Sequence, residues 1–246
     1  MIYLDNAATT KPKKEVIEAM MPYLTDYYGN PSAIYQFAGE AKAAIENARE
    51  SCARLIGAKA SAIHFTSGGT ESNNTAIIGA AMANKRAGRH IITSSVEHAS
   101  VLSVMQFLEE QGLEITYLPV NHDGVISVEE LKNAVREDTI LVSLMHVNNE
   151  IGAVMPIEEA GAAVKEKNPA ALFHVDAIQS YGKLEIRPKR MNIDMLSVSG
   201  HKIHGPKGSG FLYIKDKTKI KPIIYGGGQQ KGMRSGTENV PAIAGL

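Results

Sequence analysis

The sequence predicts an α/β protein built on one mainly parallel seven-stranded sheet with helices on both faces. Seven short apolar runs have the length and composition of buried strands. Amphipathic stretches with helical periodicity lie between most of them, and this alternation is typical of consecutive βαβ units. The chain has 246 residues and is 44% hydrophobic, so it can bury one large core.

The expected strands follow one another in chain order. They cover 63–66, 90–94, 114–118, 140–146, 172–176, 195–199 and 210–214. The expected helices cover 40–56, 71–86, 100–111, 127–135 and 156–167, and another helix starts at Val240. Only ten residues separate Ser199 from Gly210, fewer than a parallel crossover with its helix needs, so the last strand should be antiparallel.

The balance of charge excludes several classes of partner. Lys plus Arg and Asp plus Glu each number 26, so no net field attracts nucleic acid or an acidic membrane. The first residues carry neither a basic nor an apolar leader, and no apolar run is long enough to span a membrane. A cytoplasmic protein is expected. The single cysteine, Cys52, fits a reducing compartment and is expected as a half-buried helix residue rather than a catalytic thiol.

Lys202 is the first candidate for chemistry. It stands between His201 and His204, just after an expected strand and just before the Gly205-Pro206 turn. A lysine amine becomes a Schiff-base nucleophile when its surroundings lower its pKa and hold it still. A solvated surface lysine is the alternative, so other residues must support the assignment.

A glycine-rich turn follows the first expected strand. In the run 66–73 two glycines, Gly68 and Gly69, precede Thr70 and the start of a helix, whose positive end would face the turn. This arrangement favours a site for a phosphate group. The alternative is an ordinary helix N-cap at Thr70 or Ser72.

Further polar residues follow the ends of other expected strands. In open α/β sheets, ligands bind beyond these carboxyl ends. His98 could stack on a flat aromatic cofactor, and Asp176 could keep a pyridine nitrogen protonated, which makes the ring an electron sink as in pyridoxal phosphate. Asn149 or Gln179 could hold a phenolic oxygen or a substrate carboxylate. Taken singly, His98 could be a helix cap, Asp176 a turn residue and Gln179 a surface amide.

A divalent metal is the competing hypothesis for the same region. His98, His146, His174, Asp176, His201 and His204 all lie near expected strand ends. No His-x-x-x-His or Glu-x-x-His pair supplies a second anchor, however, and a metal would leave the glycine turn and Lys202 without a role. We therefore predict no metal.

Several longer motifs resemble those of a known family. They lie at 3–10, 29–32, 65–72, 97–98, 146–152, 174–180, 199–208 and 232–239. In this combination the chain resembles the cysteine desulfurases, class V members of the fold-type I pyridoxal-phosphate enzymes, which supply sulfur for iron-sulfur clusters and tRNA thiolation. The resemblance runs the whole length of the chain.

The resemblance implies a role for each candidate. Lys202 would carry pyridoxal 5'-phosphate and move protons, while His98 would stack on its ring and join in catalysis. Asp176 would pair with the ring nitrogen and Gln179 with the ring oxygen. The phosphate would be held by Gly69, Thr70, Ser199 and His201. Asn149 would help to bind the carboxylate of L-cysteine, and Thr237 would reach the phosphate site of a second subunit, which implies a homodimer.

The resemblance also implies a division of the chain. Residues 1–14 would form an N-terminal arm of the family's small domain, and residues 15–246 a pyridoxal-phosphate-binding large domain that ends early, with the C-terminal small domain absent. The family's persulfide-forming cysteine and a carboxylate-binding arginine lie later than this chain extends. The resemblance also implies a sulfur-acceptor protein, such as an iron-sulfur scaffold or a tRNA-thiolation enzyme, without specifying which. The alternatives are a non-catalytic cofactor-binding or interaction fragment, and another fold-type I enzyme such as selenocysteine lyase.

Overall fold

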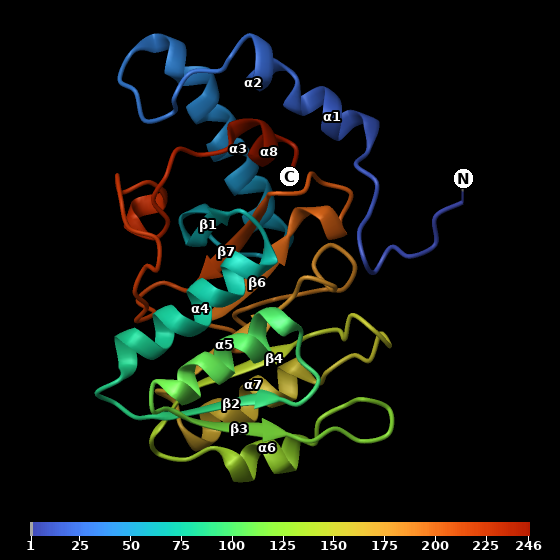
Figure 1. Cartoon of the computed structure of the whole chain (residues 1–246), viewed down its shortest axis with the longest axis vertical. Coiled ribbons are helices and arrows are strands. Elements are labelled where there is room, and N and C mark those ends of the chain that lie inside the picture. Colours follow the sequence, from blue (N-terminus) through green and yellow to red (C-terminus); the bar gives the residue numbers. More distant parts are fainter. Residues whose placement is uncertain (1) are drawn as a thin grey trace.

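A single seven-stranded sheet forms the centre of the computed structural model, which describes residues 2–246 (Figure 1). Met1, the first residue of the expected arm, lies outside the described residues. The strand order is β1-β7-β6-β5-β4-β2-β3. The strands are β1 (Ile63–Thr66), β2 (His90–Ser94), β3 (Glu114–Leu118), β4 (Thr139–Met145), β5 (Leu172–Asp176), β6 (Met195–Ser199) and β7 (Gly210–Ile214).

The predicted strand directions are confirmed. The pairs β2–β3, β2–β4, β4–β5 and β5–β6 are parallel, and β7 runs antiparallel to both β6 and β1. The predicted bounds agree with the structure for every strand except β4, which is shifted by one residue so that His146 follows the strand instead of ending it.

Most of the helices lie where the periodicity predicts them. They are α1 (Lys14–Met20), α2 (Pro22–Thr25), α3 (Gly39–Leu55), α4 (Gly69–Asn84), α5 (Ala99–Glu110), α6 (Val128–Ala134), α7 (Ile157–Lys167) and α8 (Val240–Ala244). Short 3-10 turns cover η1 (Gln36–Ala38), η2 (Ala60–Ala62), η3 (Gly200–Lys202) and η4 (Gln230–Gly232). Helix α4 begins two residues earlier than predicted, because Gly68, at φ 145°, is its N-cap and no side chain caps it.

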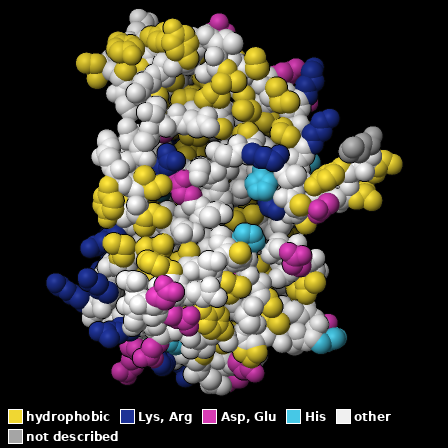
Figure 2. Space-filling model, in the orientation of Figure 1, with side chains coloured by type: hydrophobic (Ala, Val, Ile, Leu, Met, Phe, Trp, Pro, Cys, Tyr) yellow, Lys and Arg dark blue, Asp and Glu magenta, His cyan; other side chains and the backbone are white. Residues whose placement is uncertain are grey.

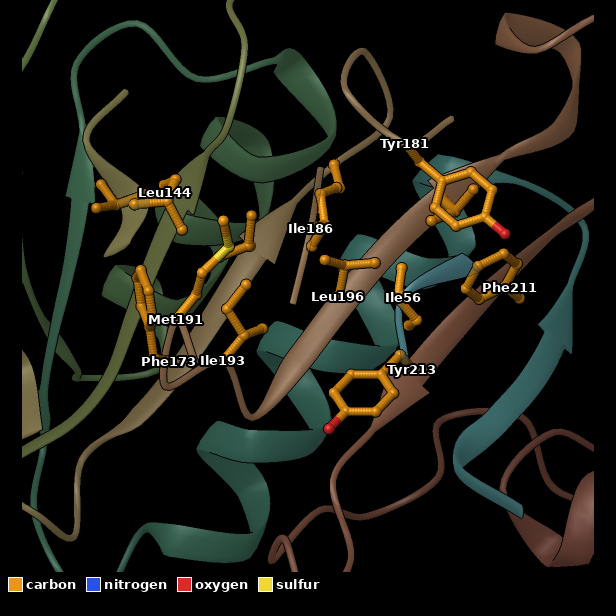
Figure 3. Packing of buried hydrophobic residues seen from close by; sticks show 14 of the residues in the cluster. Ile56, Leu144, Phe173, Tyr181, Ile186, Met191, Ile193, Leu196, Phe211 and Tyr213 are labelled. Atoms are coloured by element: carbon orange, nitrogen blue, oxygen red, sulfur yellow. The ribbon is translucent and has the colours of Figure 1, made fainter. Parts of the chain in front are cut away.

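Helices cover both faces of the sheet (Figure 1). One apolar cluster packs α4 and α5 against one face, for example through Ile77 and Met105. The larger cluster packs α3, α6 and α7 against the other face and includes Phe173. Part of this second core is visible in Figure 3, where the rings of Tyr181 and Phe211 meet edge to face with centroids 5.1 Å apart.

The expectation of a half-buried Cys52 is wrong. Its side chain lies in the larger core and only 5% of the residue is exposed, because α3 is enclosed between β1 and α8. Burial is the main reason that the pKa of the Cys52 thiol is raised to about 11. This thiol therefore stays protonated at neutral pH.

Residues 2–13 form an extended arm that docks on the segment after β6. The backbone N–H and the hydroxyl of Thr10 both donate to the carbonyl of His201 at 2.8 Å, and the N–H of His204 donates to the Thr10 hydroxyl at 2.7 Å. Apolar side chains gather on the surface around α1 and α2, where Ile17 and Leu24 are exposed (Figure 2). Among residues 2–246, no helix is long and apolar enough to cross a membrane.

Candidate active site

A cavity of about 510 Å³ opens beyond the carboxyl ends of β4, β5 and β6, beside the first turn of α4. Nine of the ten site residues predicted from the sequence line it. They are Gly69, Thr70, His98, Asn149, Asp176, Gln179, Ser199, His201 and Lys202. The N-terminal arm contributes Asp5, Ala7 and Ala8 to the wall.

Glycines bring the start of α4 to this cavity. A Cβ atom on Gly69 would lie 2.1 Å from Cδ1 of Ile178, and a Cβ atom on Gly210 would lie 2.8 Å from Cα of Gly68. Only residues without side chains allow the turn, β7 and the segment after β5 to approach so closely. The first N–H groups of this 16-residue helix and the positive end of its dipole therefore face a space that suits an anion.

Asp176 is the buried carboxyl group of the site. It is the last residue of β5 and only 5% exposed. One oxygen accepts a hydrogen bond from the N–H of Ile178 at 3.0 Å, and the other accepts one from Nδ2 of Asn73 at 2.7 Å. Burial raises the pKa of Asp176, while these two donors and the positive charge of Lys202 oppose that rise. A cationic ring nitrogen placed beside this group would favour its ionised form.

His98 is held in one orientation by Ser100. It is the N-cap of α5, and its Nδ1 accepts a hydrogen bond from the N–H of Ser100 at 3.1 Å. The hydroxyl of Ser100 lies 2.8 Å from the same nitrogen and itself accepts a hydrogen bond from Asn73 at 2.9 Å, so its proton is free to point at His98. Nδ1 therefore acts as an acceptor, and the neutral ring carries its proton on Nε2. His98 is thus both a helix cap and part of the cavity wall.

Lys202 reaches the cavity from η3. Its Nζ donates to the carbonyl oxygen of Ala7 and, at 2.8 Å, to that of Ala8. Burial and the nearby charge of Lys183 lower the pKa of Lys202, and this is partly offset by Asp5, Asp176 and Glu150. A lowered pKa raises the fraction of free amine, the form that can act as a nucleophile or accept a proton.

The remaining predicted residues complete the walls. Nε2 of Gln179 donates to the carbonyl of Ala7 at 2.9 Å, and Nδ2 of Asn149 donates to Glu150 at 2.7 Å. Burial, followed by the charges of Lys202 and Lys207, lowers the pKa of His201. The cavity thus combines one buried acid, two imidazoles and one lysine with the N-terminus of a helix.

Comparison with known proteins identifies the family. The model of the class-V aminotransferase family matches residues 2–246. The chain belongs to this family.

Named relatives agree with this result. The chain is 53% identical over 245 residues to cysteine desulfurase IscS of Methanosarcina thermophila and 52% identical over 246 residues to a cysteine desulfurase of Trichormus azollae. These alignments include 100% of the chain but only 60% and 61% of those relatives, so the chain spans about three-fifths of their length. The resemblance to cysteine desulfurases is confirmed.

Solved structures confirm the fold of this class-V chain. A NifS-like protein superimposes with a TM-score of 0.97 at 43% identity, covering 99% of this chain and 67% of that one. A structure described as SspA in complex with cysteine superimposes with a TM-score of 0.96 at 46% identity, covering 100% of this chain and 71% of that one. The match is consistent with the large domain of such enzymes.

Thr237 is the one predicted site residue that the structure places elsewhere. It is exposed and lines a separate small cavity of about 140 Å³, beside Arg234 and Glu238. Its loop is tied to the first turn of α4 by an ion pair between Nε of Arg234 and Glu71 at 2.9 Å. Within this class-V chain, Thr237 does not reach the cavity that contains Lys202.

The sequence reasoning missed Asn73, which bonds both Asp176 and Ser100. A signal for it existed, because Asn73 is a polar residue on a helix face that continues through Ile77, Ala80 and Ala81, all buried. A polar side chain on such a face needs a buried partner. The carbonyls of Ala7 and Ala8 had no sequence signal, since every residue carries one.

The described part of the chain contains no set of side chains that supports the metal hypothesis. No group of three His, Cys, Asp or Glu side chains there could hold an ion. His174 lies inside the sheet with its two ring nitrogens 2.8 Å from the hydroxyls of Ser143 and Ser197. Burial lowers its pKa to about 3, so it is a neutral residue that joins three strands.

Proposed function

We propose that this chain is the cofactor-binding part of a cysteine desulfurase and binds pyridoxal 5'-phosphate in the cavity beside α4. The observation that carries the proposal is the convergence of Lys202, Asp176 and His98 on one cavity at a helix N-terminus. These residues are far apart in the sequence, and each supplies a different function that this cofactor needs.

The residues present fit this cofactor. The turn at Gly68 and Gly69 borders a cavity that Thr70, Ser199 and His201 also line, and a phosphate would be bound there by helix N–H groups with these three residues. Asp176 would hold the protonated ring nitrogen, His98 would cover one ring face, and Gln179 would bond the ring oxygen. Lys202 would carry the cofactor covalently.

Bound pyridoxal phosphate supplies an electron sink that stabilises the carbanion formed when an amino acid loses its α-proton. The chain's own residues would prepare that step. Lys202, with its lowered pKa, would accept the proton and return it, and Asn149 would orient the substrate carboxylate. Asp176 would preserve the positive charge that makes the ring an electron sink.

The substrate is proposed to be L-cysteine and the carbon product L-alanine. Sulfur must then pass to a thiolate, and Cys52 is unsuitable because it is buried and protonated. The acceptor thiolate would come from outside these residues. We also propose a homodimer in which the exposed Thr237 of each subunit completes the phosphate site of the other, with residues 1–14 belonging to a small domain and 15–246 to the large domain.

Borohydride labelling tests the proposal. The purified chain mixed with pyridoxal phosphate should turn yellow, and reduction should fix a pyridoxyl group on the peptide that contains Lys202. Lys202→Ala should abolish the label, whereas Lys167→Ala, at the exposed end of α7, should keep it. Stable labelling of a different peptide would show that the proposed site is wrong.

A further inference from the structure

Glu97 is a buried acid that the proposed reaction does not use. It directly precedes His98 and is only 5% exposed. Its Oε1 accepts two hydrogen bonds, from the hydroxyl of Ser94 at 2.6 Å and from the backbone N–H of Met145 at 2.9 Å. The side chain therefore ties the turn after β2 to the last residue of β4.

This link affects the positions of both residues that are proposed to contact the cofactor ring, His98 and Asp176. The turn 95–98 ends at His98. The hydrogen bond from the N–H of Met145 to Glu97 therefore fixes the position from which the His98 side chain extends. Met145 pairs with Asp176 in the parallel register of β4 and β5, which places Glu97 next to the strand end that carries the buried carboxylate. A second bond, from Nδ2 of Asn148 to the carbonyl of Val96 at 3.1 Å, holds the same turn.

The surroundings of Glu97 favour its uncharged form. Its second oxygen, Oε2, is buried and has no hydrogen-bond partner among the described residues. Burial, followed by repulsion from Asp176, raises the pKa of Glu97 to about 8 against the bonds from Ser94 and Met145. His146, which follows β4, is also buried, and burial lowers its pKa, so it supplies no positive charge at neutral pH.

We propose that Glu97 is a positioning residue that works as a protonated carboxylic acid, holding the turn that presents His98 while leaving Asp176 as the buried anion of the site. This inference rests on the proposed function in treating His98 and Asp176 as ring partners. Were Glu97 ionised, two adjacent buried carboxylates would repel, and Asp176 would be less able to stay charged beside the ring nitrogen.

The first test needs no cofactor. Because the folded chain binds a proton at Glu97 that the unfolded chain has lost, Glu97 should make wild-type stability fall as pH rises from about 4.5 to about 8. Glu97→Gln copies the protonated form and removes this loss. The melting temperature of Glu97→Gln minus that of wild type should therefore grow with pH over this range and level off above it. If the melting temperatures of wild type and Glu97→Gln changed in parallel from pH 5 to 9, the proposal would be overturned.

The second test measures pyridoxal-phosphate binding by absorbance at pH 7. Glu97→Gln should bind within about threefold of wild type, while Glu97→Ala, which loses both bonds, should bind about tenfold or more weakly. Amide hydrogen exchange at 95–98 should be faster in Glu97→Ala only. The control is Glu110→Gln, an exposed glutamate at the end of α5, which should match wild type.

The outcomes separate the two proposals. If Glu97→Gln is as defective as Glu97→Ala, or if Glu97→Ala behaves as wild type, the role of Glu97 is refuted. If Glu97→Ala does not fold, the cofactor affinity of Glu97→Gln and the pH dependence of its melting temperature still test the role of Glu97. If wild type binds no pyridoxal phosphate, the proposed function fails, whereas the pH profile and hydrogen exchange continue to test the charge state and the turn.

Discussion

Asn73 and Asp176 are joined by a 2.7 Å hydrogen bond across 103 positions of sequence. The same amide nitrogen of Asn73 donates its second proton to Ser100 at 2.9 Å, and Ser100 in turn orients His98. One fully buried side chain of α4 thus links the acid at the end of β5 to the imidazole at the start of α5. The spacing of the two proposed ring partners depends on this residue.

We expect Asn73→Ala to weaken both the fold and the site. It removes two buried hydrogen bonds, one of them to a carboxylate, and should lower the free energy of unfolding by about 2–4 kcal/mol. Pyridoxal-phosphate affinity should fall at least tenfold. Urea denaturation and absorbance titration measure the two effects, and Asn133→Ala, on the exposed surface of α6, is the control. An unchanged pyridoxal-phosphate affinity of Asn73→Ala would show that Asn73 does not support the site.

Gly69→Ala should be destabilising because the new side chain would overlap that of Ile178. Its new Cβ would lie 2.1 Å from Cδ1 and 2.9 Å from Cγ1 of Ile178. Overpacking of this kind costs about 1–3 kcal/mol of unfolding free energy. Ile178→Ala removes both atoms, so the double variant should recover part of the loss.

A double-mutant cycle measured by urea denaturation checks this prediction for Gly69. Strictly additive effects of Gly69→Ala and Ile178→Ala would contradict it, because residues in contact are expected to couple. Recovery of stability without recovery of pyridoxal-phosphate binding would mean that the backbone of the turn, not only its packing, has moved.

Lys183 should tune the amine of Lys202. The charge of Lys183 helps to lower the pKa of Lys202, so Lys183→Met should raise that pKa. Less free amine would then be present at a given pH, and the pH profile for covalent incorporation of pyridoxal phosphate should move to higher pH. Stopped-flow absorbance from pH 6 to 10 measures the shift. Lys167→Met should leave this pH profile unchanged. A shift of the Lys183→Met profile to lower pH would contradict the prediction.

Cys52 should be unreactive in the folded chain. A rise in its pKa from 9.0 to about 11 lowers the thiolate fraction at pH 8 about a hundredfold, and burial limits access further. Modification by a disulfide reagent should therefore be at least a hundredfold slower than in urea-unfolded chain. Cys52→Ala should bind pyridoxal phosphate as wild type does. Rapid labelling under native conditions would show that α3 opens far more readily than its packing implies.

Much of the fold was predictable because its signals are local. Six of the seven strands have the predicted bounds, and the short connection from Ser199 to Gly210 was enough to predict that β7 is antiparallel. The site residues at strand ends were predictable for a related reason, since the carboxyl ends of parallel strands meet at one edge of the sheet. Hydrophobic periodicity and connection length are properties of neighbouring residues, so they can be read without coordinates.

The partners of those residues were decided by tertiary structure alone. Asn73 acquires its role only when α4 packs across the sheet beside β5, and Glu97 only when the turn after β2 reaches β4. Thr237 was expected from its motif to serve a second subunit, and the structure places it outside the cavity that contains Lys202, in agreement with that expectation. Sequence determined which chemical groups stand at the strand ends. Packing between distant segments determined which of them are buried, bonded and charged, because burial and hydrogen bonding depend on neighbours in space.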